Sequence, residues 1–200
     1  MMSSHEVAND RIGPNAIIQV MEALHAAIGG PATLAFFNTV GLGHYMEERP
    51  REMVSERDVA ILQIALREQF GVEMAKAISW DAGQRTGDYL LANRIPALAQ
   101  TILRWMPAAF AARVLAGAIA RHSWTFAGSG TFRVTPGTPF VFSIQRNPIC
   151  SKIRADSPSC DYYAATFERI FRAIVHPMSR VVETECESMG ASACVFEVRW

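Results

Sequence analysis

The sequence lacks a surplus of charge of either sign. Its 200 residues include 19 Lys and Arg and 19 Asp and Glu, so the formal net charge is zero. Nucleic-acid-binding modules normally carry a basic surplus, and attachment to anionic lipid normally uses a polybasic segment. The balance argues against both and favours a partner that is small and apolar, or another protein. Half of the residues are hydrophobic, which excludes a disordered chain.

A targeting or membrane-spanning segment is also lacking. Residues 1–15 are polar and contain no apolar stretch of the secretory type. The most apolar region, 97–120, is interrupted by Arg104, Pro107 and Arg113, so we do not expect it to cross a bilayer as one span. Peripheral contact with a membrane stays open. We expect a cytoplasmic chain with reduced thiols, in which clustered cysteines suggest a metal before a disulfide.

No site for an electron donor is evident. The sequence has no G-x-G-x-x-G after an expected strand, so a Rossmann nucleotide site is not indicated. Apart from the cysteines considered below, no cysteine set suits an iron–sulfur cluster. The short Gly128-Ser-Gly130 lies between an expected helix and an expected strand, which is the wrong context for binding phosphate.

The residues that are present divide into two halves, helical from about 14 to 122 and mostly strand-like from about 130 to 200. The expected helices are 15–28, 32–40, one following Ser55 up to Phe70, 72–91, two that begin at Pro96 and Pro107, and 161–175. The expected strands are 131–134, 140–145, 181–185 and 193–200. The fold class is α+β, with a helical N-terminal half packed on a four-stranded antiparallel sheet. We expect residues 1–13 to be flexible and residues 14–200 to form a single ligand-binding domain.

Three small residues in the helix at 72–91 are spaced by four. Ser79, Gly83 and Gly87 therefore share one helix face. Glycine inside a helix costs about 1 kcal/mol relative to alanine, which close approach of another backbone offsets. The alternative is a break in the helix near Gly83.

The C-terminal region contains a pattern of metal-ligand type. Cys160 is followed by twenty-two residues, then by Glu183-x-x-Cys186, seven residues and Cys194. Thiolate sulfur and carboxylate oxygen both bind zinc, and four protein ligands close a tetrahedron. Positions three apart on a flat strand face opposite sides, so Glu183 and Cys186 converge only if the strand ends or bulges between them.

The residues alone leave alternatives open at this site. Glu185 and Glu187 are rival ligands. The cysteines can also be small buried hydrophobic residues without a metal. Cys150 has no partner in the pattern and is interpreted as an ordinary thiol.

The C-terminal motifs resemble a known family. The ending VVETECESMGASACVFEV (181–198) and the helix DYYAATFERIF (161–171) before it resemble the 4-vinyl-reductase domain. RIGPNAI (11–17), AGQRTGDYLLANRIP (82–96) and HSWTFAGSGTF (122–132) extend the resemblance to the bacteriochlorophyll-biosynthesis 4-vinyl reductase family. The resemblance implies a small-molecule-binding fold related to the TRAPP subunits and to the haem nitric-oxide-binding domains.

The resemblance also implies a metal. In the related aromatic-effector sensors a zinc is held by Cys, Glu, Cys and Cys, which match Cys160, Glu183, Cys186 and Cys194 here. Such a zinc is structural, since no coordination position is left for water.

The implied function is at the reduction of a vinyl group of a divinyl (proto)chlorophyllide-type intermediate. Because no donor site is evident, we expect the chain to bind or deliver the magnesium tetrapyrrole. The alternatives are an authentic vinyl reductase with an external electron donor, and a sensor or scaffold module for another small apolar ligand. Other pigment-biosynthesis enzymes are expected partners, with a homodimer built on the apolar helices and a place at the periphery of the photosynthetic membrane.

A tetrapyrrole is a flat apolar disc with carboxylates at its edge, so it needs an aromatic cleft with a cation at the rim. His122 could supply an axial nitrogen to magnesium, and Arg94 could pair with a propionate. Each residue also has a structural interpretation, as core or as part of a helix end. The candidate ligand-binding residues are Tyr89, Arg94, His122, Trp124, Phe126 and Tyr163.

Overall fold

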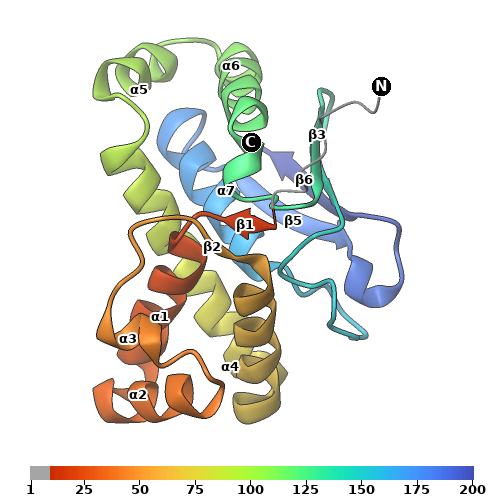
Figure 1. Cartoon of the computed structure of the whole chain (residues 1–200). Helices are drawn as coiled ribbons and strands as arrows, with labels where there is room; N and C mark the ends of the chain where they lie inside the picture. Colours follow the sequence, from red (N-terminus) through yellow and green to blue (C-terminus); the bar gives the residue numbers. More distant parts are fainter. Residues whose placement is uncertain (1–9) are drawn as a thin grey trace, which may run out of the picture.

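The computed structural model describes residues 10–200, and its helices cover one side of a single larger sheet (Figure 1). The helices are α1 (Asn15–Ile28), α2 (Gly30–Thr39), α3 (His44–Glu47), α4 (Glu56–Asn93), α5 (Ala97–Arg104), α6 (Ala108–Arg121) and α7 (Asp161–Ile174), with short 3-10 turns η1 (Ser123–Thr125) and η2 (Glu187–Met189). The strands are β1 (Arg11–Ile12), β2 (Val54–Ser55), β3 (Thr131–Thr135), β4 (Phe140–Gln145), β5 (Arg180–Glu185) and β6 (Cys194–Arg199). The α+β class is confirmed.

The larger sheet is antiparallel throughout and has the order β3-β4-β6-β5. Its buried face is set by alternation, because β4 and β6 bury every second side chain. Phe142 pairs with Phe196, and Ile144 pairs with Cys194. The pairing of β5 with β6 shifts between Glu183 and Glu185. This bulge supplies the irregularity that Glu183 and Cys186 need in order to converge.

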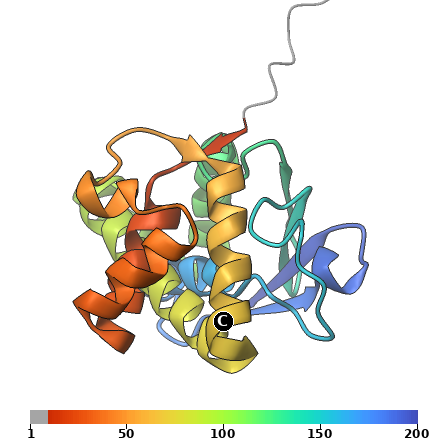
Figure 2. The same cartoon turned by 60° about the horizontal axis from the view of Figure 1, so that its bottom comes forward.

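Helix α7 is the centre of the molecule, between α4 and the sheet (Figure 2). Its residues 162–168 are all buried. A Cβ added at Gly83 would collide with the Tyr162 carbonyl oxygen, and one at Gly87 would lie 2.6 Å from Arg169 Cβ. The predicted close approach along this face is therefore confirmed, and the alternative break near Gly83 is wrong. The helical run is instead interrupted at Gly71, where φ is 78°.

The N-terminal half differs from the prediction in two details. The second helix begins at Gly30, before the expected Ala32, because Gly29 adopts φ of 81° and ends α1 there. The expected loop 41–50 contains the one-turn helix α3. Of the segment expected to be flexible, residues 1–9 lie outside the described part, and Arg11–Ile12 pair with Val54–Ser55. No described helix has the length and apolar character to span a bilayer.

Aromatic rings fill the space between α7 and the sheet. Phe142 lies 5.0 Å from Phe167 and 5.6 Å from Phe171, measured between ring centroids. Phe167 also contacts Phe196 of β6, at 5.7 Å. Rings that pack edge to face at such distances add stability beyond their buried area. This core fixes α7, and with it the position of Cys160, against the sheet.

Candidate metal centre

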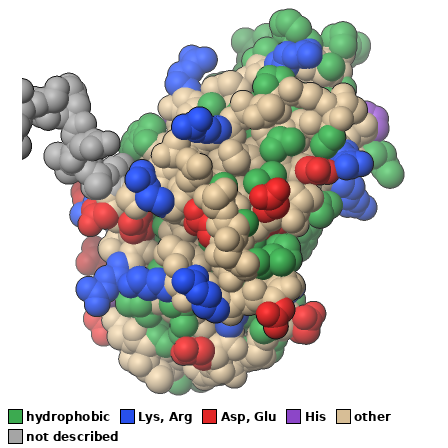
Figure 3. Space-filling model, turned by 90° about the vertical axis from the view of Figure 1, so that its right-hand side faces the viewer, with side chains coloured by type: hydrophobic (Ala, Val, Ile, Leu, Met, Phe, Trp, Pro, Cys, Tyr) green, Lys and Arg blue, Asp and Glu red, His purple; other side chains and the backbone are tan. Residues whose placement is uncertain are grey.

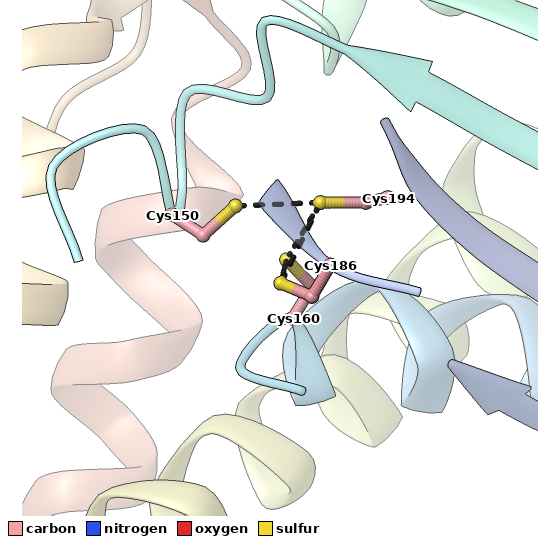
Figure 4. Close-up of side chains that lie close together, drawn as sticks. All are labelled: Cys150, Cys160, Cys186 and Cys194. Atoms are coloured by element: carbon pink, nitrogen blue, oxygen red, sulfur yellow. Dashed lines mark hydrogen bonds between the residues drawn. The ribbon is translucent and has the colours of Figure 1, made fainter. Parts of the chain in front are cut away.

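Four cysteines from four segments meet in one buried cluster (Figure 4). Cys150 lies in the loop after β4, and Cys160 is the N-cap residue of α7. Cys186 follows β5, and Cys194 begins β6. Each is fully buried, and all four are free thiols. The cluster therefore ties together the start of the central helix and three parts of the sheet region.

The sulfur spacing fits a tetrahedral metal. The Sγ atom of Cys194 lies 3.3 Å from that of Cys150, 3.5 Å from that of Cys160 and 3.7 Å from that of Cys186. All four sulfurs lie within 4.8 Å of one another. A disulfide needs about 2.05 Å, whereas zinc with bonds of about 2.3 Å to four sulfurs holds them about 3.8 Å apart. The cluster thus has the donor type and nearly the spacing of a closed zinc site.

The charge of the cluster also favours a bound cation. Burial raises the pKa of the Cys160 thiol well above its usual value. A set of buried thiolates is stable only beside a cation, which removes the protons as it binds. A soft sulfur set selects zinc over magnesium or calcium.

Nearby polar groups donate hydrogen bonds to the sulfurs. The Asn147 side-chain amide donates to Cys160 Sγ at 3.2 Å, and the Ser188 hydroxyl donates to Cys186 Sγ at 3.0 Å. The backbone N–H of Glu187 donates to Cys194 Sγ at 3.4 Å. Such donors stabilise negative sulfur and orient the ligands of a metal.

The turn between β5 and β6 positions two of the sulfurs. Gly190, with φ of 91°, reverses the chain between Cys186 and Cys194. The Glu187 carboxylate accepts from the backbone N–H groups of Arg146 and Asn147, at 2.7 and 2.8 Å. Glu187, a rival ligand in the sequence, thus holds the loop that carries Cys150. The other rival, Glu185, is exposed.

Glu183 lies next to the cluster but is not one of the four groups that meet in it. Its Oε2 accepts from the backbone N–H of Cys160 at 2.8 Å. Its Oε1 is buried and has no hydrogen-bond partner among the described residues. Burial, and next the Cys186 sulfur, raise the pKa of Glu183 to about 10. In this arrangement the carboxyl is protonated near neutral pH.

The predicted ligand set is therefore brought together in part. Cys160, Cys186 and Cys194 lie in the cluster, and the place of Glu183 in a metal's coordination stays a prediction. Cys150, which the sequence pattern left outside, lies inside. The signal that could have included it is that all four cysteines of the chain occur between residues 150 and 194.

Two of the candidate ligand-binding residues belong to the aromatic core. Tyr163 is buried, and its hydroxyl donates to the Phe126 carbonyl oxygen at 2.6 Å. The Phe126 ring is half-buried and lies 6.0 Å from the Tyr163 ring and 5.2 Å from that of Phe132. These rings form the edge of the core beside η1 and β3.

The other four candidates are more exposed. His122 is exposed, and its Nδ1 lies 2.9 Å from the Ala118 carbonyl oxygen of its own helix. Trp124 is 55% exposed, Tyr89 is half-buried, and Arg94 is the exposed residue that ends α4. His122, Trp124 and Phe126 come from one segment, whereas Tyr89 and Arg94 come from another.

The two best hollows of the described structure lie elsewhere. One, of about 630 Å³, is lined by β1, β2 and the loop around α3. The other, of about 350 Å³, is lined by Gln84, Arg169, Arg172 and Pro177. Neither includes any of the six candidate ligand-binding residues, whose role stays a prediction.

Comparison with known proteins adds a family. The family model of the 4-vinyl-reductase domain matches residues 140–200, the part that contains all four cysteines. The chain is 47% identical over 188 residues to the bacteriochlorophyll synthase 23 kDa chain of Cereibacter sphaeroides, covering 94% of this chain and 90% of that one. This chain belongs to the family of bacteriochlorophyll synthase 23 kDa chains. The protein of the same name from Rhodobacter capsulatus is 40% identical over 186 residues, 93% of this chain and 85% of the relative.

A solved structure shares the fold. The phenol-responsive sensory domain of the transcription activator PoxR, crystallised with phenol, matches with a TM-score of 0.51 at 16% identity. The match covers 74% of this chain and 76% of that domain. At this identity the likeness shows the fold alone, and it agrees with the ligand-binding fold expected from the sequence.

Proposed function

We propose that this protein binds a divinyl (proto)chlorophyllide-type magnesium tetrapyrrole and presents it at the vinyl-reduction step of bacteriochlorophyll synthesis. The observation that carries the proposal is family membership across nearly the whole chain, with relatives named as a chain of bacteriochlorophyll synthase. The shared fold supports a binding role, because the solved relative is a sensory domain crystallised with an aromatic molecule.

The segment between α6 and β3 is the proposed place of entry for the pigment. Here an exposed imidazole, an exposed indole and a half-buried phenyl ring follow one another as His122, Trp124 and Phe126. Beneath them lies Tyr163, at the edge of the aromatic core. A flat apolar guest can stack on such rings, and the imidazole can bind its magnesium. Tyr89 and Arg94 are proposed as further contacts, with Arg94 pairing with a propionate.

The cysteine cluster is proposed to hold one structural zinc. Cys160, Cys186 and Cys194 supply three ligands in either assignment. The arrangement described here favours Cys150 for the fourth, with Glu183 accepting from the Cys160 backbone instead. The metal would cross-link the start of α7 to the sheet and so fix the helix that carries Tyr163.

Titration with divinyl protochlorophyllide tests the binding proposal. The Soret band of the pigment is expected to shift on mixing with the protein. Phe126→Ala is expected to weaken binding, whereas Phe70→Ala, another half-buried ring that packs on Phe36, is the control. An unchanged Soret band at saturating pigment would contradict the proposal.

A second pair of variants tests the imidazole. His122→Ala is expected to weaken binding of the magnesium pigment but not of the magnesium-free pigment, which has no axial position to fill. His25→Ala is the matched control, because His25 is an exposed histidine in the last turn of α1. Equal effects of His122→Ala on both pigments would remove the axial role.

Anaerobic incubation separates binding from catalysis. The protein, the pigment and reduced nicotinamide or flavin are incubated without any other protein. We expect no conversion of vinyl to ethyl, because the reduction is assigned to a partner that supplies electrons. Turnover under these conditions would make the protein a reductase. The name of the relatives supports such a partner among the chains of bacteriochlorophyll synthase.

A further inference from the structure

The zero net charge of the chain conceals a separation of charge along the sequence. Residues 89–155 contain no Asp or Glu and eight Lys and Arg. The rest of the chain therefore carries eight more acids than bases. Helices α5 and α6 lie within the stretch that has no acids and form one end of the molecule (Figure 1).

The outer face of α5 and of the turn after it is apolar. Leu98, Ile102 and Trp105 are spaced by four and three, so they share one helix face. They are 72%, 47% and 88% exposed. An indole with most of its surface in water is unusual for a folded chain and marks a contact surface.

Helix α6 continues this surface and adds positive charge. Phe110 and Val114 are 52% and 44% exposed. Arg113 and Arg121 are exposed on the same side of the helix. Neither arginine is in an ion pair among residues 10–200. Figure 3 shows hydrophobic and basic side chains together at the upper end of the molecule.

We propose that this outer face of α5–α6, defined by Leu98, Ile102, Trp105, Phe110, Arg113, Val114 and Arg121, docks on an anionic lipid bilayer. Tryptophan favours the depth of the lipid headgroups, and the aliphatic side chains enter the acyl boundary beside it. Arginine pairs with lipid phosphate while its stem stays in the apolar layer.

Charge decides between a bilayer and a protein as the occupant of this face. A protein interface of this kind usually mixes acids with bases, whereas this face and the whole stretch around it lack carboxylates. Negative lipid phosphates meet no repulsion there. No described helix could span the bilayer, so the helices would lie in the interfacial plane. The inference stands on these residues and does not depend on pigment binding.

Vesicle flotation tests the inference with the full chain. Vesicles of phosphatidylcholine alone are compared with vesicles that also contain phosphatidylglycerol. The protein is expected to float with the anionic vesicles only, and less so as salt rises. Failure to float with anionic vesicles, or equal binding to both kinds, would overturn the inference.

Paired variants place the contact on the proposed face. Trp105→Gln, and separately the double variant Arg113→Gln with Arg121→Gln, are each expected to weaken binding at least about tenfold. The controls are Val182→Gln, an apolar residue of β5 that is 58% exposed, and Arg51→Gln, an exposed arginine outside the stretch. Equal losses in the controls would contradict the assignment of the face.

Molar mass measured by light scattering covers the competing occupant. With lipid absent, the wild type and Trp105→Gln are expected to have the same mass. A wild-type dimer that Trp105→Gln dissociates would make this face an interface between copies of the chain, and so would overturn the proposal.

Discussion

The cysteine cluster and the outer face of α5–α6 are built in opposite ways. The cluster brings together four side chains from separate segments and removes all of them from water. The outer face comes from two adjacent helices and leaves its largest side chain, Trp105, 88% exposed. Burial makes the first a site that a metal can stabilise, whereas exposure makes the second a surface that adds little to folding. Substitutions in the two regions should therefore differ in kind.

The largest effect is expected from losing a cluster cysteine. Cys186→Ser is expected to lower the metal content and to destabilise the fold by about 4 kcal/mol or more, which lowers Tm by about 10 °C. Metal is measured by elemental analysis and Tm by calorimetry. A variant that loses all its metal yet melts like the wild type would refute the structural role.

The fourth ligand is tested by comparing Cys150→Ser with Glu183→Gln. If Cys150 is a ligand, its loss should weaken metal binding much more than the loss of Glu183, whose carboxyl is protonated in this arrangement. The cobalt-substituted protein reports the change, because sulfur-to-cobalt charge-transfer bands lose intensity when a thiolate is lost. The opposite ranking would assign the position to Glu183, as the family resemblance implies.

The packing of α4 on α7 should be sensitive to a single methyl group. Gly83→Ala is expected to cost about 1–3 kcal/mol, because its Cβ would meet the Tyr162 backbone. Gly117→Ala, on the outer side of α6 where nothing lies within 4 Å, is expected to stabilise by about 0.5–1 kcal/mol. Urea unfolding measures both. Equal effects would mean that the two helices are not packed as described.

The smallest effect on folding is expected at the outer face itself. Trp105→Gln should change the free energy of unfolding by less than about 0.5 kcal/mol, since the side chain is almost wholly exposed. The same variant is expected to lose vesicle binding. A large fall in stability would show that Trp105 is part of the core, contrary to the comparison above.

Local patterns predicted most of the fold because they report directly on the backbone. Apolar spacing marked the helices, and the small residues at Ser79, Gly83 and Gly87 marked the contact of α4 with α7. The kink at Gly71 fell at the junction of two expected helices, since a φ of 78° costs glycine least.

The site could be predicted only where its members follow a motif. Cys160, Cys186 and Cys194 belong to such a pattern. Cys150 lies in an irregular loop whose path depends on hydrogen bonds from Arg146 and Asn147 to the distant Glu187, which no local pattern shows.

The charge argument failed to describe the surface for a similar reason. A net charge summed over the chain does not show that the acids and bases occupy different segments. The overall balance argued against anionic lipid, while the segment 89–155 carries eight unopposed positive charges. Charge is informative about partners when it is counted face by face.

Zinc-edge X-ray absorption on the purified wild-type chain tests the central claim most directly, namely that four buried sulfurs hold one structural metal. The account predicts one zinc per chain with four sulfurs at about 2.3 Å and no oxygen or nitrogen ligand. A shell of three sulfurs and one oxygen, or a folded chain that contains no zinc and gains none when zinc is added, would contradict it.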